Sequence, residues 1–192
     1  SNNKGVIWAN QFDNTANCKG HYETTGKEIW EQTGGKIDGF VCASGTGGTI
    51  AGVSNALKEK KKNIKIYLSD PKGSCLYSYI KTKEFKSDGN SITEGIGSSR
   101  VTKNFEKALI DDAYSIDDTI ALTVLFDLIE KEGLSLGTSS GINVAGAIKL
   151  AQELGPNKTI VTILCDKSDR YQGKLFNKKF LMEKNLPYPR WL

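Results

Sequence analysis

Short apolar runs alternate with longer amphipathic segments along most of this chain. Residues 39–43, 64–68 and 159–164 have the composition of strands, and the last run is nearly continuous, as in a strand buried on both faces. Residues 5–9 are a weaker strand candidate. Because parallel strands need crossover connections, strands that alternate with helices form mostly parallel sheets. The pattern therefore predicts an α/β fold, with a mostly parallel sheet and helices on both faces.

Helical periodicity occupies the segments between these runs. It covers residues 21–33, 49–62, 117–132 and 141–154, and the pair Gly155-Pro156 ends the last of these helices. A chain of 192 residues is long enough to bury one hydrophobic core. We therefore expect one compact domain.

The charge pattern argues against a nucleic-acid partner. The formal net charge is only +4, and the densest basic run, residues 58–62, falls at the expected end of a helix, where the helix dipole favours cations. Nucleic-acid sites combine basic residues with aromatic or arginine side chains, and this run contains neither. No apolar run approaches the length of a membrane span.

The cysteines indicate reduced thiols rather than a disulfide framework. The four of them are scattered, and Cys42 and Cys165 lie in or next to runs that read as buried strands. The only histidine, His21, has Cys18 three residues away but no second pair of ligands to complete a tetrahedral site. We therefore predict no metal site and a reducing compartment.

A glycine-rich loop follows the first predicted strand of the central part of the chain. Residues 44–49 read Ser-Gly-Thr-Gly-Gly-Thr and lead directly into a predicted helix. Backbone N–H groups at a helix start, together with the positive end of the helix dipole, form an anion site. The loop has neither the lysine of a P-loop nor the glycine spacing of a dinucleotide fingerprint. It therefore predicts a site for another phosphate-bearing ligand.

Two further clusters of small residues allow a structural and a functional interpretation. Residues 136–141 lead into a helix, so Ser139 or Ser140 could be a plain N-cap, or the cluster could face a ligand. Residues 94–97, Glu-Gly-Ile-Gly, fit a simple turn equally well as a close approach of the backbone to a ligand.

The order and spacing of several motifs resemble one enzyme family. The motifs are Asn-Gln-Phe-Asp-Asn at 10–14, Thr-Thr-Gly at 24–26, Gly-Thr-Gly-Gly-Thr at 45–49, Ser-Asp-Pro at 69–71, Glu-Gly-Ile-Gly at 94–97 and Ser-Ser-Gly at 139–141. The chain resembles the C-terminal portion of the cysteine synthase (O-acetylserine sulfhydrylase) family, which is also similar to cystathionine β-synthase. These are pyridoxal 5′-phosphate (PLP) enzymes of fold type II. The resemblance implies that residues 1–192 are the large PLP-binding domain, with residues 1–12 at its junction with a preceding small domain.

The resemblance also implies roles for particular residues. Ser139 would hydrogen-bond the pyridine nitrogen of PLP, Gln11 would lie near the substrate, and Gly95 would lie beside the substrate-bearing face of the cofactor. Asp166 is either a supporting residue of the site or an ordinary aspartate at a strand end. The 5′-phosphate would be held by the loop residues Gly45, Thr46, Gly47, Gly48 and Thr49.

The family's catalytic lysine has no counterpart in this sequence. Family members carry the Schiff-base lysine in a Ser-x-x-Lys-type segment and bind the substrate carboxylate with a Thr-Ser-Gly-Asn-Thr-type loop, and neither occurs here. Lys72 and Lys103 do not stand in a matching context. Residues 186–192 do resemble a family C-terminus. We therefore expect a fragment that contains no catalytic residue and is inactive by itself.

The complete polypeptide is expected to make L-cysteine from O-acetylserine, or a similar activated serine, and sulfide. The alternatives are a cystathionine β-synthase or a serine/threonine dehydratase-like enzyme, and, in a different class, a non-catalytic protein that keeps a PLP or phosphate site. The resemblance implies a homodimeric parent protein. The expected compartment is the cytoplasm or the mitochondrion.

Overall fold

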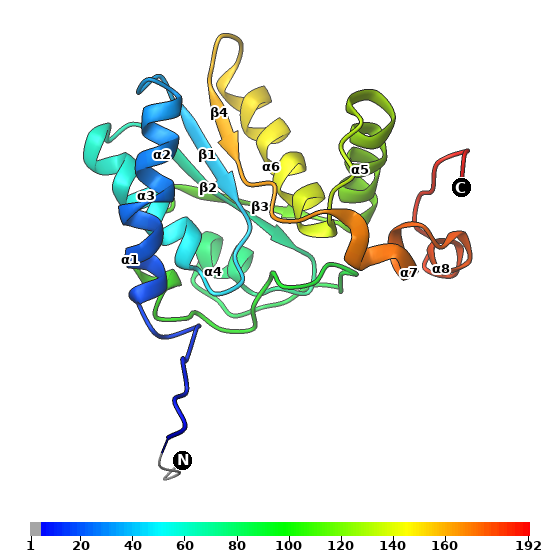
Figure 1. The fold of residues 1–192 in the computed structure, drawn as a ribbon, viewed down its shortest axis with the longest axis horizontal. Helices are drawn as coiled ribbons and strands as arrows, with labels where there is room; N and C mark the ends of the chain where they lie inside the picture. Colours follow the sequence, from blue (N-terminus) through cyan, green and yellow to red (C-terminus); the bar gives the residue numbers. More distant parts are fainter. Residues whose placement is uncertain (1–4) are drawn as a thin grey trace.

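The computed structural model describes residues 5–192, which form a parallel sheet covered by helices (Figure 1). Its four strands stand in the order β3-β2-β1-β4, and every neighbouring pair is parallel. This confirms the predicted fold class. The strands are β1 (Gly39–Cys42), β2 (Lys65–Pro71), β3 (Asp112–Ile116) and β4 (Ile160–Thr162).

The strand order creates a switch point beside β1. The chain passes from β1 outward to β2 and β3, and then returns to the opposite side of β1 to form β4. Gly39 therefore pairs with Lys65 on one side and with Ile160 on the other. In open parallel sheets, ligands bind beyond the carboxyl ends of the strands at such a point. The topology therefore directs attention to the loops that follow β1 and β4.

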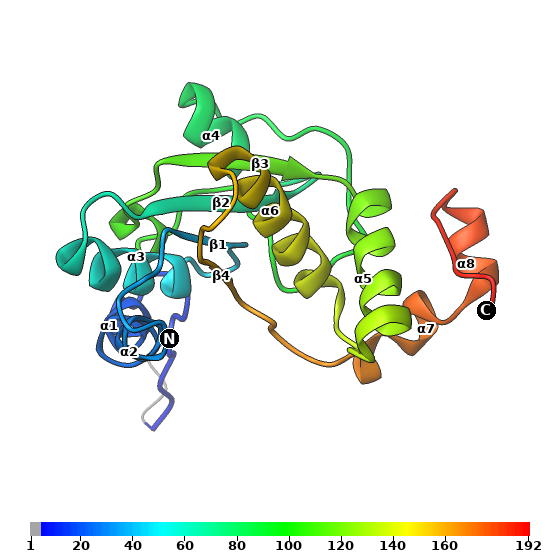
Figure 2. The same cartoon turned by 90° about the horizontal axis from the view of Figure 1, so that it is seen from above.

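Helices cover both faces of the sheet (Figure 2). One side has α1 (Ala16–Glu23), α2 (Thr25–Gln32), α3 (Gly48–Lys60) and α4 (Leu76–Thr82), and the other has α5 (Asp118–Glu132) and α6 (Thr138–Leu154). The remaining elements are η1 (Phe105–Lys107), η2 (Ser168–Tyr171), α7 (Gln172–Leu175) and α8 (Lys178–Glu183). Across residues 5–192, no helix combines the length and the hydropathy that crossing a bilayer requires.

Alternate residues of the central strands face opposite layers, which explains why β1 and the middle of β2, Ile66 to Leu68, are apolar in succession. Phe40 packs into one cluster with Ile50 and Leu57 of α3, while Val41 packs into another with Leu150 of α6. Each large side chain buried in this way stabilises the fold by about 1.5–3 kcal/mol. The two clusters clamp β1 between α3 and α6, so the loop that follows β1 starts from a rigid position.

The strand predictions need three corrections. Residues 159–164 were expected to form a strand buried on both faces, but only Ile160–Thr162 form β4, which lies at an edge of the sheet and is partly exposed. Residues 5–9 form neither strand nor helix, and Ile7 and Trp8 are 93% and 80% exposed, so that candidate is wrong. The other edge strand, β3, was not predicted, because polar residues interrupt its sequence, Asp-Ala-Tyr-Ser-Ile.

Two predicted helices differ in extent from those in the structure. The helix predicted over 21–33 is two helices, and the break falls at Thr24, whose backbone angles (φ −118°, ψ −84°) are not helical. The helix predicted from residue 141 begins earlier, at Thr138. Helix α3 matches its prediction to within two residues at each end.

Candidate functional site

The glycine-rich loop lies at the carboxyl end of β1, and tight packing surrounds its glycines. A Cβ atom on Gly45 would lie 2.3 Å from the carbonyl oxygen of Gly95, and one on Gly48 would lie 2.2 Å from Asn17 Oδ1. Gly47, with φ +87°, is the N-cap of α3. The positive φ and the close neighbours require glycine here, because a side chain would strain the backbone or collide.

The loop presents backbone donors that no protein group uses. Within residues 5–192, the backbone N–H groups of Gly45, Thr46 and Gly47 donate no hydrogen bond to protein. The hydroxyl of Ser44 is buried and also has no partner there. Uncompensated donors at the positive end of a helix dipole fit a phosphate dianion. The structure therefore brings the predicted phosphate-binding residues together at one point of the sheet's carboxyl edge.

A histidine behind the loop is linked to its last hydroxyl. The Nε2 atom of His21 lies 3.1 Å from Thr49 Oγ1, and its Nδ1 atom lies 3.0 Å from Thr25 Oγ1. Burial lowers the pKa of His21, so the ring is neutral at pH 7. The sequence analysis considered His21 only as a metal ligand, because the contact with Thr49 joins two elements and leaves no local pattern.

The second loop, residues 94–97, packs directly on the first. The backbone N–H of Gly97 donates to the carbonyl oxygen of Ser44 at 2.8 Å. Gly95 and Gly97 both have positive φ, +75° and +81°. Both are therefore in the backbone region that favours glycine. This arrangement places Gly95 against Gly45, as a shared site requires.

Ser139 lies in the same region and faces a pocket. The pocket holds about 290 Å³ and is lined by Glu94, Gly95, Ile96, Ser139, Cys165, Asp166, Arg170 and Tyr171. Ser139 is 4% exposed, and its hydroxyl makes no hydrogen bond to protein within the described residues. The lining does not include Gln11 or the residues of the glycine-rich loop. Two predicted residues, Ser139 and Gly95, therefore share one pocket.

The N-cap interpretation of the serine cluster is wrong. The N-cap of α6 is Gly137, and no side chain caps this helix end. Ser139 and Ser140 both lie inside the first turn, and Ser140 Oγ instead accepts a hydrogen bond from the backbone N–H of Cys165 at 3.1 Å. The hydroxyl of Ser140 therefore ties the helix to the segment after β4.

Asp166 lines the pocket from the end of the segment that follows β4. Its Oδ2 atom accepts a hydrogen bond from the hydroxyl of Tyr171 at 2.8 Å, whereas its Oδ1 atom is buried and has no partner within residues 5–192. Burial, reinforced by this hydrogen bond, raises the pKa of Tyr171 to about 12. A Cβ atom on Gly137 would lie 2.0 Å from Oδ1, so the carboxylate lies against the start of α6.

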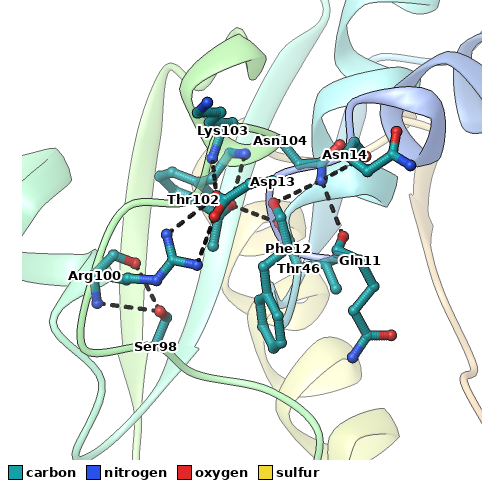
Figure 3. A network of polar contacts seen from close by, with 11 residues as sticks. Gln11, Phe12, Asp13, Asn14, Thr46, Ser98, Arg100, Thr102, Lys103 and Asn104 are labelled. Carbon is teal, nitrogen blue, oxygen red and sulfur yellow. Dashed lines mark hydrogen bonds and ion pairs between the residues drawn. The ribbon is translucent and has the colours of Figure 1, made fainter. Parts of the chain in front are cut away.

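Gln11 lies on an exposed turn next to these loops, and its side chain points away from the polar network around it (Figure 3). Its carbonyl oxygen accepts a hydrogen bond from Asn104 Nδ2 at 3.2 Å. The neighbouring Thr102 donates its hydroxyl to the carbonyl oxygen of Thr46 at 2.6 Å. Gln11 is therefore joined to the glycine-rich loop through Thr102 and Asn104, neither of which the sequence analysis singled out.

The cysteines and acidic residues form no metal site in the described part of the chain. No group of three or more His, Cys, Asp or Glu side chains there is placed to hold an ion. All four cysteines are free thiols; Cys18, Cys42 and Cys75 are buried, and Cys165 is exposed.

Comparisons with known proteins identify relatives of this chain. Cysteine synthase 1 of Neurospora crassa is 48% identical over 186 residues, which cover 94% of this chain and 50% of that protein. Cysteine synthase of Dictyostelium discoideum is 46% identical over 190 residues, with 94% and 50% covered. The chain therefore spans about half the length of these relatives.

A solved structure shares the fold. The crystal structure of an O-acetylserine dependent cystathionine β-synthase from Helicobacter pylori superposes with a TM-score of 0.78 and 34% identity, covering 85% of this chain and 51% of that one. The family model described as "Pyridoxal-phosphate dependent enzyme" matches residues 1–166, which include the glycine-rich loop, the Gly95 loop and Ser139. By that match, by these relatives and by its fold, the chain belongs to the family of pyridoxal-phosphate dependent enzymes.

Proposed function

We propose that the polypeptide containing these residues is a cysteine synthase, which replaces the β-substituent of O-acetylserine, or a similar activated serine, with sulfide to give L-cysteine. The observation that carries this proposal is the 48% identity with a cysteine synthase over 94% of the chain. The amino-acid substrate and sulfide are the small-molecule partners.

The residues present fit PLP. Unpaired N–H groups of Gly45, Thr46 and Gly47, with Gly48 and Thr49 at the start of α3, would hold its phosphate. The hydroxyl of Ser139 would donate a hydrogen bond to the pyridine nitrogen, because a neutral hydroxyl does not keep that nitrogen protonated. When bound, PLP withdraws electron density from the α-carbon of an attached amino acid. Through this neutral contact Ser139 would favour β-elimination and β-replacement over transamination.

The substrate side is formed by Gln11 and Gly95. Gly95 has positive φ and lies against Gly45, so a substrate on the cofactor can approach its backbone closely. Gln11 would contact the substrate with its free side-chain amide. Asp166 would support Ser139 through the start of α6, against which its carboxylate lies.

Residues 1–192 are proposed to be the large domain, preceded in the parent protein by a small domain that carries the family's lysine segment. In that arrangement the isolated residues bind PLP but do not turn over substrate. We propose a homodimeric parent protein in the cytoplasm or the mitochondrion, where the four free thiols stay reduced.

The decisive experiment measures cysteine formation by the complete parent polypeptide, here called the full chain, with PLP, O-acetylserine and sulfide. The same assay is run on residues 1–192 alone. Activity of the full chain only is the expected result. Absence of activity in both, together with saturable PLP binding, would instead favour a non-catalytic PLP-binding protein. Turnover by residues 1–192 alone would contradict the proposed role of the preceding segment.

A second candidate is a cystathionine β-synthase activity on the same site. The Helicobacter pylori structure, 34% identical, belongs to an enzyme of that name that depends on O-acetylserine. Homocysteine in place of sulfide distinguishes the two functions: formation of cystathionine at a higher kcat/KM than cysteine would favour the second. Release of ammonia and a keto acid from serine or threonine would indicate a dehydratase.

A further inference from the structure

Residues 98–105, here named the strap, run between the Gln11 turn and the glycine-rich loop (Figure 3). At the Gln11 turn, the two terminal nitrogens of Arg100 each donate a hydrogen bond of 3.1 Å to Asp13, one to each carboxylate oxygen. The backbone N–H of Lys103 donates to Asp13 Oδ1 at 3.0 Å. The hydrogen bond from Arg100 is the main reason that the pKa of Asp13 lies below its usual range. The turn is therefore held by charge as well as by backbone contacts.

The side chain of Asn104 hydrogen-bonds to the same turn. It is fully buried, and its Nδ2 atom lies 3.2, 2.8 and 3.2 Å from the carbonyl oxygens of Gln11, Phe12 and Asn14, so its two hydrogens serve three acceptors and one hydrogen is shared. Its Oδ1 atom accepts from the backbone N–H of Cys18 at 3.1 Å. A buried amide with these four partners cannot shift without leaving a polar group unpaired. The backbone position of Gln11 therefore follows the position of Asn104.

The strap contacts the glycine-rich loop through Thr102, two residues before Asn104. The hydroxyl of Thr102, which is almost fully buried, donates to the carbonyl oxygen of Thr46 at 2.6 Å and accepts from the backbone N–H of Phe105 at 3.0 Å. Phe105 also closes over Gly47, since a Cβ atom there would lie 2.6 Å from the Phe105 nitrogen. One short segment therefore touches both halves of the site.

We infer that Asn104 and Thr102 are positioning residues, and that the strap couples the substrate-facing turn of Gln11 to the phosphate-binding loop. The coupling is mechanical: Thr102 and Asn104 are separated by one residue, so a displacement at one contact is transmitted to the other. This inference rests on the proposed function for the roles of Gln11 and the loop. Binding of phosphate at the loop would then order the turn that meets the substrate.

The test is hydrogen exchange of the complete parent polypeptide without ligand, followed by mass spectrometry of peptides covering residues 10–15 and 44–54. The second peptide includes hydrogen-bonded amides of the first turns of α3, such as the Ala51 N–H that donates to Gly47. Arg100→Gln removes side-chain contacts with the turn only, whereas Thr102→Val removes the contact with the loop and also the acceptor of the Phe105 N–H within the strap. Coupling predicts that each variant speeds exchange in both peptides, by about threefold for Arg100→Gln, the value of a well-oriented exposed ion pair. Arg100→Lys, which keeps the charge but not the two-point geometry, should restore part of the protection.

The matched controls lie far from the strap. Lys131→Gln removes an exposed ion pair with Asp127, and Thr33→Val removes a hydroxyl bond to the carbonyl of Ile29; neither should change exchange in the two peptides. If Thr102→Val prevents folding, Arg100→Gln still decides the question. Faster exchange confined to residues 10–15 in Arg100→Gln would overturn the coupling.

A PLP titration followed by fluorescence separates this inference from the proposed function. Coupling predicts that Arg100→Gln, which touches no loop residue, weakens PLP binding about threefold, whereas Lys131→Gln does not. If the wild-type full chain binds no PLP, the proposed function fails, while the exchange pattern still decides the coupling. Unchanged PLP affinity in Arg100→Gln, with a wild-type chain that does bind, would count against the coupling alone.

Discussion

The backbone N–H of Ala43, at the end of β1, donates to the Oδ1 atom of Asn143 on α6 at 2.6 Å. The Nδ2 atom of the same side chain donates to the carbonyl oxygen of Ile163 at 2.7 Å and lies 3.5 Å from the sulfur of Cys165. One buried amide therefore joins α6 to the ends of β1 and β4. Because Ser139 is one turn earlier on the same helix, Asn143 sets its separation from the glycine-rich loop.

Replacement of Asn143 by Asp should destabilise the protein strongly. The side chain is 1% exposed. A carboxylate would place an oxygen against the carbonyl oxygen of Ile163, which would lose the N–H donor that Asn143 supplies. We expect the free energy of unfolding to fall by about 2–4 kcal/mol, as measured by urea denaturation. Asn157→Asp on an exposed turn is the control. A loss below about 0.5 kcal/mol for Asn143→Asp, the range of ordinary surface changes, would show that the amide is not structural.

Replacement of Gly45 by Ala should damage the phosphate site. The new methyl group would lie 2.3 Å from the carbonyl oxygen of Gly95, so the two loops must move apart. Overpacking of this kind costs about 1–3 kcal/mol, and we expect PLP affinity to fall about tenfold or more. The matched control is Gly20→Ala on α1, where nothing lies within 4 Å of the added atom. Equal PLP affinities in the two variants would argue against the loop as the phosphate site.

Ser139 and Ser140 should separate binding from stability. Ser139→Ala removes a hydroxyl with no protein partner in the described structure, so the unfolding midpoint should change little while the absorption and fluorescence of bound PLP shift. Ser140→Ala removes the acceptor of the Cys165 N–H, and should cost about 1 kcal/mol. The opposite pattern, with the PLP spectrum altered only in Ser140→Ala, would move the pyridine contact to Ser140.

Asp70, at the end of β2, should make stability depend on pH. It is fully buried, and burial raises its pKa to about 6 although the backbone N–H of Tyr77 donates to Oδ2 at 2.7 Å. Between the unfolded-state pKa of about 4 and about 6, the folded state binds more protons than the unfolded state. The contribution of Asp70 to the free energy of unfolding is therefore fully present below pH 4 and is lost as the pH rises through 6.

The difference between wild type and Asp70→Asn isolates this effect, which has a size of about 2–3 kcal/mol. His21, whose pKa burial lowers, produces the opposite slope below its usual pKa, so the wild-type curve alone is not diagnostic. We expect Asp70→Asn to gain stability relative to wild type from pH 4 to pH 7 in urea titrations. A constant difference across that range would mean that Asp70 keeps an ordinary pKa.

The central strands and the glycine-rich loop were predictable because local physics determines them. Residues buried on both faces of a sheet are apolar in succession, and the positive φ of Gly47 and the close contacts of Gly45 leave glycine as the only residue that fits. The edge strand β3, Asp-Ala-Tyr-Ser-Ile, lacked that signal because polar residues interrupt it. The other edge strand, β4, was predicted because its sequence is apolar although its residues are only partly buried. The family resemblance added the predicted roles of Ser139 and Gln11, which periodicity alone does not reveal and which stay predictions.

The sequence by itself determined the parallel α/β architecture, the place of the glycine-rich loop and the family. Only the tertiary structure decided which polar residues hold the site together. Asn104 reaches Gln11 across 93 positions of the chain, and Asn143 reaches Ala43 across 100. The local sequence does not distinguish a buried, fully hydrogen-bonded asparagine from an exposed one. Its partners lie on distant segments that meet only when the sheet and its helices pack.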